Sequence, residues 1–304
     1  MKNCLIINPG IISEELLLDN YINKKYNFNF YRSNKNWVED FEYLSKYDII
    51  LLEDYDGYYE DKFIEFQSKI DFINKKIIPI DLFFEKNTRR IPLFKMHDLW
   101  YLSNNSFTSK NIVKSFLIKR YFDLILVLIL LPISILLIIL ASIFIKATSS
   151  GPIFFTQNRV GLRGKHFVIY KLRTMFHKTE GHVDPTRKDD DRIFPVGLIL
   201  RKLKIDELPQ LLNIILGDMS FIGPRPERVE IVNLLCKEYP LYSLRHMVRP
   251  GLSGWAQVNN PTATPDDNLV KLEYDLYYIK NPSILLELKI YFRTFLIIIN
   301  KNSL

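Results

Sequence analysis

The chain of 304 residues is 48% hydrophobic and 25% charged, which is enough for one large or two modest domains with cores of their own. Its formal net charge of +7 suits anionic partners such as phospholipid headgroups or phosphorylated substrates. The sequence has no dense Lys/Arg tract and no nucleic-acid motif, so we do not expect nucleic acid as a partner. Cys4 and Cys236 are the only cysteines, which excludes a disulfide framework and fits a reducing compartment.

The first 108 residues have the pattern of a small α/β domain. Short apolar runs alternate with segments of helical spacing, and this alternation favours parallel strands in a three-layer arrangement. The expected strands are Cys4–Ile7, Asp48–Leu52 and Lys76–Ile80, with a weaker candidate at Asn27–Tyr31, and the expected helices are Glu14–Ile22 and Lys62–Ile73.

The first predicted strand runs into Asn8-Pro9-Gly10, which is not the glycine fingerprint of a dinucleotide site. We therefore expect residues 1–108 to form a small Rossmann-like domain for docking or regulation, without a dinucleotide. The N-terminal residues also lack the basic and apolar regions of a secretory signal. A polar, irregular connector from Lys86 to Ser109 is expected to follow.

A long apolar segment follows a helical pattern that begins near Ser109. The segment from Leu124 to Ile145 has no charged residue, and its length of roughly 22 residues could cross a bilayer core as a straight helix. Pro132 lies near its middle, where it removes a backbone hydrogen bond and predicts a bend. Residues 109–149 are therefore predicted to form one bent membrane helix.

Both flanks of this segment are basic. The cytoplasmic side of a membrane collects Lys and Arg, and a single span would place one basic cluster on the other side. A re-entrant helix, which enters, bends at Pro132 and leaves by the same face, satisfies both clusters. The alternatives are an ordinary transmembrane helix and, less favoured for so much Leu and Ile, a buried helix of a soluble domain. The flanking cations are Lys110, Lys114, Lys119 and Arg120 on one side and Lys146, Arg159, Arg163 and Lys165 on the other.

The C-terminal segment Ile284–Ile299 repeats this apolar character at lower intensity. It carries Glu287, Lys289 and Arg293 among apolar residues, so it is too short and too charged to span a bilayer. An interfacial helix on the membrane surface fits this pattern, and packing in the protein core fits it equally well.

Short polar motifs follow the apolar segment. A turn at Ser150 leads into an extended run, residues 159–165 suggest a basic hairpin turn, and the next stretch reads YKLRTM. In that stretch Lys171 and Arg173 are expected to share one face of a strand, where an anion would relieve their repulsion. A solvated basic strand is the alternative. The charged segment His177–Asp191, with three consecutive Asp, is interpreted as a surface loop rather than a metal cluster.

The segment RKLKIDELPQLLN, residues 201–213, contains two adjacent acids among cations. Pro209 is tolerated only in the first turn of a helix, so Asp206 and Glu207 are expected near a helix N-terminus. A helix cap explains either acid alone. A phosphate site, where the carboxylates share a divalent cation with the substrate, also explains the neighbouring Arg201. Aspartate is in addition a competent nucleophile toward phosphorus.

Two further motifs carry an arginine beside rigid or glycine-rich backbone. In GDMSFIGPRPE, Arg225 lies between two prolines, a stiff setting for a forked contact with phosphate oxygens. In VRPGLSGWAQV, Arg249 precedes a glycine-rich turn and Trp255, which is expected to offer an aromatic surface.

These motifs together resemble the bacterial sugar transferases, the monotopic phosphoglycosyl transferases that act on polyprenyl phosphates. The matching elements are the basic-flanked apolar helix with Pro132, YKLRTM, IDELPQLLNIILGDMSFIGPRPE, VRPGLSGWAQV and EYDLYYIKN, which cover roughly residues 115 to 300 in family order. The extra N-terminal region resembles the larger subgroup that starts exopolysaccharide, capsule, O-antigen lipopolysaccharide or other glycoconjugate repeat units.

The resemblance implies a mainly helical catalytic region over residues 150–304, ending in the interfacial helix, and a re-entrant membrane helix before it. It implies that Asp206 is the nucleophile and that Glu207 is a Mg²⁺ ligand or general base, with Asp206 and Glu207 at the metal. It further implies that phosphate groups contact Lys171, Arg173, Arg201, Arg225 and, nearer the nucleotide, Arg249.

The implied reaction moves a phosphosugar from a UDP-sugar to undecaprenyl or another polyprenyl phosphate. UMP leaves first, and a phosphosugar on Asp206 is then passed to the lipid. The implied location is the cytoplasmic face of the bacterial inner membrane, and the subgroup suggests a homodimer. Two other functions fit the residues: a non-catalytic membrane adaptor for polysaccharide assembly, and a metal-dependent phosphatase of lipid diphosphates.

Overall fold

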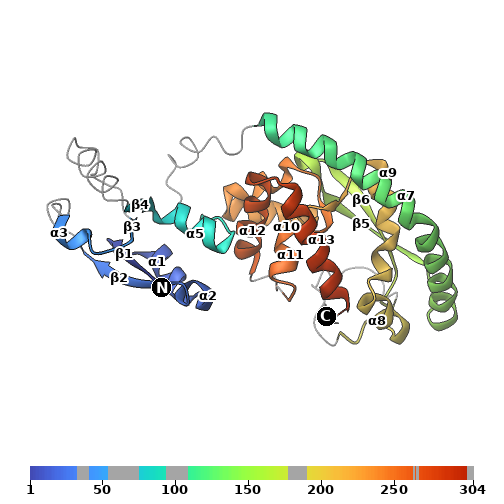
Figure 1. The fold of residues 1–304 in the computed structure, drawn as a ribbon. Helices are drawn as coiled ribbons and strands as arrows, with labels where there is room; N and C mark the ends of the chain where they lie inside the picture. Colours follow the sequence, from blue (N-terminus) through green and yellow to red (C-terminus); the bar gives the residue numbers. More distant parts are fainter. Residues whose placement is uncertain are drawn as a thin grey trace. The chain divides into compact units, whose positions relative to one another are not determined.

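The computed structural model describes residues 1–32, 41–53, 75–93, 109–176, 190–262, 264 and 267–299. The chain divides into two compact units, Met1–Asn104 and Asn105–Leu304 (Figure 1). The expected boundary after residue 108 and most of the expected connector lie outside the described residues.

The N-terminal unit contains a four-stranded, fully parallel sheet in the order β2-β1-β3-β4. Each strand is short and rich in Ile, Leu, Phe or Tyr, the residues that fit a pleated and half-buried surface. All four expected strands are therefore confirmed, including the weaker candidate at β2. The strands are β1 (Lys2–Ile7), β2 (Tyr26–Tyr31), β3 (Ile49–Leu52) and β4 (Lys76–Pro79).

The helices of this unit differ from the prediction in their bounds. The expected helix Glu14–Ile22 is wrong as one element, because the Asp19 side chain accepts hydrogen bonds from the backbone of Tyr21 and Ile22 and starts a new helix there. The helix α5 (Ile80–Thr88) includes residues 86–88, which were expected to belong to the irregular connector. The expected helix Lys62–Ile73 lies outside the described residues. The described helices are α1 (Ile11–Leu18), α2 (Asn20–Asn23), α3 (Phe41–Leu44) and α5 (Ile80–Thr88).

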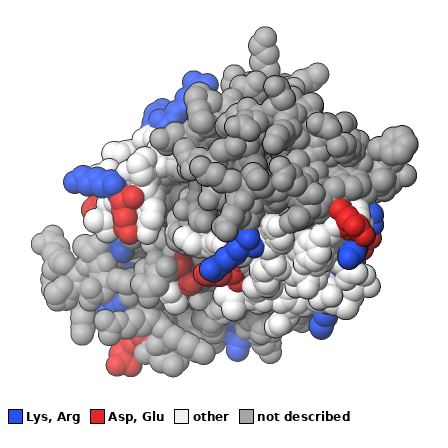
Figure 2. All heavy atoms as spheres, turned by 90° about the vertical axis from the view of Figure 1, so that its left-hand side faces the viewer, with Lys and Arg blue, Asp and Glu red and all other residues white. Residues whose placement is uncertain are grey.

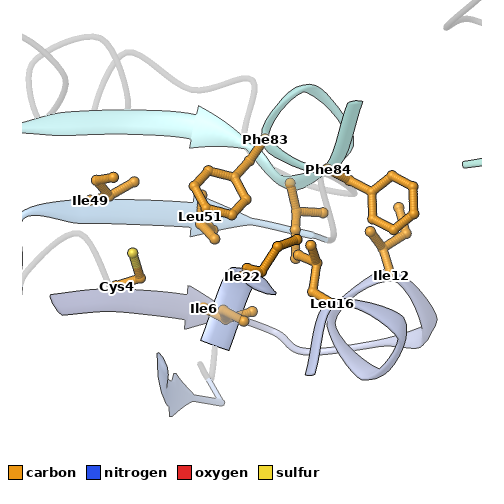
Figure 3. Packing of buried hydrophobic residues seen from close by; sticks show 10 residues of the cluster. Cys4, Ile6, Ile12, Leu16, Ile22, Ile49, Leu51, Phe83 and Phe84 are labelled. Carbon is orange, nitrogen blue, oxygen red and sulfur yellow. The ribbon is translucent and has the colours of Figure 1, made fainter. Parts of the chain in front are cut away.

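Apolar side chains cover both faces of this sheet. Alternate residues of β1 point to opposite faces, so Cys4 and Ile6 join one core cluster and Leu5 and Ile7 join the other. In the first cluster, Phe83 and Phe84 of α5 turn toward the strands and toward α1 (Figure 3). A parallel sheet buried on both faces confirms the α/β class for this unit.

A carboxylate fills the position at the start of α1 where a nucleotide phosphate is often bound in parallel α/β sheets. Glu53, directly after β3, accepts hydrogen bonds from the backbone N–H groups of Gly10 (2.6 Å), Ile12 (2.7 Å) and Ser13 (3.2 Å). These donors would otherwise be open to an anion. An internal carboxylate therefore occupies these backbone donors, and the docking or regulatory role of the unit stays a prediction.

The C-terminal unit begins with α7 (Ser109–Thr148), a helix of 40 residues with Pro132 inside it. The ribbon of α7 changes direction along its course, as a proline within a helix leads one to expect (Figure 1). Within the described residues, Ile118–Thr148 is the one helix long and apolar enough to cross a membrane. Only 17% of its most apolar window is buried, so it is not the core helix of a soluble domain.

The remaining elements fold around two small sheets. The hairpin β5–β6 is antiparallel, as the basic turn predicted, and β7 pairs with β8 in parallel. The elements are β5 (Phe154–Val160), η4 (Leu162–Gly164), β6 (His166–Leu172), α8 (Pro195–Lys202), η5 (Ile205–Gln210), α9 (Leu211–Leu216), β7 (Ser220–Ile222), α10 (Val229–Glu238), η6 (Pro240–Met247), β8 (Gly251–Ser253), α11 (Trp255–Asn259), α12 (Asn268–Lys280) and α13 (Ile284–Ile299), where η denotes a 3₁₀ helix.

The last helix, α13, has both a packed and an exposed apolar face. Leu286 and Ile290 are buried, whereas Leu285, Leu288 and Phe292 are exposed. Core packing thus applies to one face of α13, and the interfacial position of its exposed apolar face stays a prediction. Most of the charged segment His177–Asp191 lies outside the described residues.

Charged side chains are mixed in sign on the face drawn in Figure 2. Among the residues described there, Lys and Arg lie beside Asp and Glu and do not gather in one region. The described part of this face is therefore mixed in sign.

Candidate active site

The two adjacent acids lie in a 3₁₀ turn, η5, that directly precedes α9. Lys204 adopts a left-handed conformation (φ 57°) and turns the chain from α8 into η5. Neither acid makes a capping hydrogen bond to the start of η5, so the interpretation of Asp206 as an N-cap is wrong. Pro209 lies inside η5, where a 3₁₀ turn tolerates it and an α-helix interior would not.

Glu207 is held by two cations from other parts of the unit. Its Oε1 accepts hydrogen bonds from Nζ of Lys171 (3.0 Å) and from Nη2 of Arg225 (2.7 Å). Burial alone would raise the pKa of Glu207, but Arg225 and Lys171 outweigh it and hold that pKa well below its usual range. Glu207 is therefore ionised at neutral pH.

Asp206 has the opposite environment. It is 7% exposed, and its Oδ1 is buried without a hydrogen-bond partner among the described residues. Burial, together with the charge of Glu207, raises the pKa of Asp206 from 3.8 to about 6. Two neighbouring carboxylates thus have pKa values pushed apart, which is the pattern of groups with different chemical roles.

The surroundings of the two acids are cationic. Lys171, Lys204 and Arg201 all act electrostatically on Asp206, and Arg225 acts on Glu207. Together with Arg159, which also acts on Glu207, these cations outnumber the two acids and leave a surplus of positive charge. Such a surplus suits a substrate that carries a diphosphate.

Asn213 fixes the distance between the acids and the strand that carries Lys171. Its side chain is fully buried, donates to the carbonyl of Val168 (2.7 Å) and accepts from the backbone N–H of Tyr170 (3.2 Å). The amide of one side chain therefore substitutes for a strand neighbour of β6. This contact holds α9, and with it η5, against β6.

The loop after β7 brings Arg225 to Glu207. Gly223 and Gly251 lie so close together that a Cβ on Gly251 would meet the nitrogen of Gly223 at 2.1 Å. Only glycine permits this approach of backbone to backbone. The close packing of β7 against β8 fixes where the segment Pro224-Arg225-Pro226 begins.

Arg173 lies away from the acid pair. It follows the end of β6, and its guanidinium donates to Oγ (2.7 Å) and the carbonyl (3.0 Å) of Ser149 and to the carbonyl of Pro152. It therefore ties the end of α7 to β6. The sequence had suggested that Arg173 shares an anion with Lys171, and these contacts place its guanidinium on Ser149 and Pro152 instead. β6 ends at Leu172, so the alternation that would place the two cations on one face does not extend to Arg173.

Arg249 and Trp255 also differ from expectation. Nε of Arg249 donates to the carbonyl of Gly217 (2.8 Å) at the end of α9, and Arg249 is not among the cations that act on either acid. Trp255 is 2% exposed, with Lys289 and Arg293 over its ring, so it is a buried anchor of α13 and not an aromatic surface. Of the seven predicted site residues, the structure thus groups Asp206, Glu207, Lys171, Arg201 and Arg225.

Charged residues at the start of the apolar helix bind the elements that carry the site. Nζ of Lys119 donates to the carbonyl of Ile222 (2.6 Å) and Arg120 donates to the carbonyl of Ile215 (3.0 Å). The backbone N–H of Phe221 donates to Asp123 (3.3 Å). The apolar helix is therefore attached both to α9 and to β7.

The two acids fit Mg²⁺ as a ligand set. Mg²⁺ usually takes one or two carboxylates and completes its shell with water and substrate phosphates. The unpartnered Oδ1 of Asp206 is a hard oxygen donor of this kind, and both cation contacts of Glu207 fall on Oε1 alone. No group of three or more His, Cys, Asp or Glu side chains that could hold a metal ion occurs among the described residues.

Three residues that support the site did not stand out in the sequence as site residues: Asn213, Arg159 and Arg245. Asn213 lies within the DELPQLLN segment, and a polar side chain in an apolar helical run was the available signal. Arg159 and Arg245 had no such signal, because their contacts with the Arg225 segment join parts of the chain far apart in sequence.

The part of the chain that contains the site is similar in sequence to known proteins. The bacterial sugar transferase family profile matches residues 114–301, more than half of the chain. UDP-N-acetylgalactosamine-undecaprenyl-phosphate N-acetylgalactosaminephosphotransferase of Aeromonas hydrophila is 46% identical over 179 residues, which are 58% of this chain and 42% of that protein. The sugar transferase EpsL of Bacillus subtilis is 41% identical over 180 residues, 57% of this chain and 83% of EpsL. UDP-glucose:undecaprenyl-phosphate glucose-1-phosphate transferase of Caulobacter vibrioides is 41% identical over 180 residues, 58% of this chain and 67% of that protein. The chain belongs to the bacterial sugar transferase family.

Proposed function

We propose that this chain is a phosphoglycosyl transferase, a sugar-1-phosphate transferase that moves a phosphosugar from a UDP-sugar to a polyprenyl phosphate and releases UMP. The observation that carries the proposal is the pair of acids with opposite pKa shifts inside a cationic site. The relatives from Aeromonas and Caulobacter, whose names include a UDP-sugar and undecaprenyl phosphate, support these two substrates. The product would start a repeat unit of an exopolysaccharide, capsule, O-antigen or other glycoconjugate.

The site would work at the cytoplasmic face of the bacterial inner membrane, with α7 as a re-entrant helix. Support comes from the basic residues on both flanks of α7, from Pro132 within it and from its largely exposed apolar surface. The lipid phosphate would then meet the acids at the bilayer surface. A homodimer remains a prediction from the subgroup.

In the first step ionised Asp206 attacks the sugar-bearing phosphorus. A lone pair of its carboxylate forms the new O–P bond, and the bond from that phosphorus to the bridging oxygen breaks, so UMP leaves with the electron pair. Lys171 and Arg225 lie beside Glu207 and would also stabilise the phosphate charge. The phosphosugar is now an acyl phosphate on Asp206.

In the second step an oxygen of the polyprenyl phosphate attacks the same phosphorus. The acyl phosphate bond breaks, the carboxylate of Asp206 is recovered, and a polyprenyl diphosphate sugar is formed. The attacking phosphate already carries negative charge, so no proton has to be removed. A general base is therefore unnecessary, and the low pKa of Glu207 would make it a poor one.

Asp206 and Glu207 would hold Mg²⁺, which would supply neutralisation of the negative charge on the diphosphate. Glu207 in addition keeps Lys171 and Arg225 at fixed positions beside the nucleophile. The covalent step separates the two anionic substrates in time, which avoids bringing their phosphates together at once.

The test is incubation of the full chain in detergent micelles with Mg²⁺, polyprenyl phosphate and a panel of UDP-sugars. We expect UMP and a lipid-linked sugar from at least one UDP-sugar, and D206N should lower UMP release at least about 1,000-fold. Near-normal turnover of D206N would refute the covalent scheme. Inorganic phosphate as the product would indicate a lipid diphosphate phosphatase, and no product from any sugar would indicate an adaptor.

A further inference from the structure

The backbone around Arg225 is held from outside at four consecutive carbonyls. Two prolines flank Arg225, so the segment has few N–H groups with which to fix itself. Each carbonyl from Pro224 to Glu227 instead accepts a hydrogen bond from another segment. The donors, in chain order of the carbonyls, are Gly251 N (3.0 Å), Arg245 Nη2 (3.0 Å), Arg159 Nη1 (2.9 Å) and Val160 N (3.1 Å).

One of the two side-chain donors, Arg245, is fixed by a buried ion pair. Its Nη2 also donates to Oδ2 of Asp275 on α12 (2.8 Å), and its Nη1 donates to Tyr242. The side chains of Arg245 and Asp275 are 6% and 1% exposed. Apolar residues of similar volume would often stabilise a core as well as such a pair does. A guanidinium, by contrast, can reach Asp275 and the carbonyl of Arg225 at the same time.

The other side-chain donor, Arg159, approaches from β5. Besides the carbonyl of Pro226 it donates to Oε1 of Gln157 (2.8 Å), and it lies 3.6 Å from the carboxylate of Glu227. Arg159 and Arg245 thus approach neighbouring carbonyls from two different elements. Together they leave the segment little freedom to shift.

We propose that Arg245 and Arg159 are positioning residues that set the Arg225 guanidinium on Glu207 and on the substrate diphosphate. The Arg225 side chain is 43% exposed, so packing alone does not hold it in place. The position of its backbone therefore decides where its guanidinium lies. This inference rests on the proposed function for the role of Arg225 toward substrate, although the contact with Glu207 is independent of it.

Loss of either positioning residue moves Arg225 away from Glu207. The Arg225 guanidinium then no longer meets Glu207 and the substrate diphosphate from a fixed place, so the rate of UMP release falls.

The experiment is a double-mutant cycle on the full chain in detergent micelles. R245K and R159K keep the positive charge but lose the planar guanidinium that can donate to two partners at once. Each of them is combined with R225Q. We expect R245K alone to lower kcat for UMP release by roughly 10- to 100-fold. On the R225Q background the further loss should be less than about threefold, because the residue being positioned is already gone. R159K should behave in the same way.

The matched control is R293K, a partly buried arginine on α13 whose guanidinium donates to Asn259 and lies over the ring of Trp255. Its effect should add to that of R225Q. The same variants are also compared by thermal unfolding, which needs no turnover. R245K should lower the midpoint more in the wild-type background than in R225Q.

The outcomes separate the two proposals. Non-additive kcat values and midpoints support positioning, whereas full additivity in both overturns it even if UMP is released. If the wild-type chain releases no UMP but the midpoints are non-additive, the proposed function fails and the placement of Arg225 by Arg245 stands. An unchanged kcat in R245K, with UMP release intact in the wild type, would also overturn the inference.

Discussion

Asp206 and Glu207 are neighbours in the chain but lie in different environments. Glu207 contacts two cations, whereas Asp206 is buried with one oxygen unpartnered among the described residues. The η5 turn produces this difference, because successive residues of a 3₁₀ helix point about 120° apart. One acid can then be held as an anion while the other is kept reactive.

The pH dependence of the first step should follow Asp206. Its pKa is raised to about 6, and only the ionised form attacks phosphorus, so UMP release should rise with pH through about 6 and level off above 7. The measurement is burst release of UMP from a UDP-sugar without polyprenyl phosphate, because the lipid phosphate itself loses a proton near this pH. Constant burst rates from pH 5 to pH 8 would contradict the assignment of Asp206 as nucleophile.

The same shift predicts a conflict between stability and function. Because the folded-state pKa of Asp206 is raised, the stability it contributes is fully present below about 3.8 and is lost as pH rises through about 6. D206N has no charge to bury, so at pH 7.5 without Mg²⁺ it should be more stable than the wild type by on the order of 2 kcal/mol. At pH 4 the two midpoints should converge.

The control for this comparison is D267N. The pKa of Asp267 is lowered by the backbone N–H of Thr264, so its charge is favoured in the folded state. Its contribution is present at neutral pH and is lost as pH falls, and D267N should therefore not raise the midpoint at pH 7.5. A D206N midpoint at or below that of the wild type would show that the buried charge of Asp206 is not costly.

The individual cations show which contacts the sequence patterns predicted and which they did not. The stiff Pro-Arg-Pro sequence predicted a fixed Arg225, and the structure places it on Glu207. The pairing of Lys171 with Arg173 failed, because β6 ends before Arg173 and Ser149 binds its guanidinium. Alternation along a strand is a local rule, whereas the end of a strand depends on what packs beyond it.

Elements with strong local signals were predicted well. The four parallel strands and the long apolar helix with Pro132 follow directly from runs of apolar residues. The predicted bounds of a helix were wrong where a single side chain determines them. Asp19 is an example, because it caps a new helix and divides the predicted one in two. The acids were expected near a helix N-terminus, and they lie in the first turn of a helix, which is a 3₁₀ helix with Pro209 inside it.

The topology of α7 can be tested through its two ends. A re-entrant helix places both ends on the cytoplasmic side, whereas a spanning helix places one of them outside. We expect single cysteines at Asn111 and Ser150, in a C4A/C236S background, to escape an impermeant maleimide applied to intact spheroplasts. Both should be labelled in inverted vesicles. Labelling of either position from outside would indicate a spanning helix.

At the scale of the whole molecule, the two units differ in the site residues that they carry. Every grouped site residue lies in the Asn105–Leu304 unit, which also contains the family match. In the Met1–Asn104 unit, Glu53 fills the anion position at the start of α1. Among its described residues, none is grouped with the acid pair, and its docking or regulatory role stays a prediction.

Deletion of residues 1–104 should leave UMP release within about threefold of the full chain, because no site residue is removed. Deletion of residues 1–123 is the matched control. It also removes Lys119, Arg120 and Asp123, which bind β7 and the end of α9, and it should abolish activity. Loss of activity already in the shorter deletion would show that the N-terminal unit supports catalysis.

By itself the sequence determined the α/β class of the N-terminal unit, the apolar helix and the family, because these depend on local periodicity and on motifs that are contiguous in the chain. Only the tertiary structure decided which cations reach the acids. Lys171 and Arg225 approach Glu207 from segments 36 and 18 residues away, and Arg245 reaches the carbonyl of Arg225 across 20 residues. Such contacts depend on packing between elements, which no local pattern records.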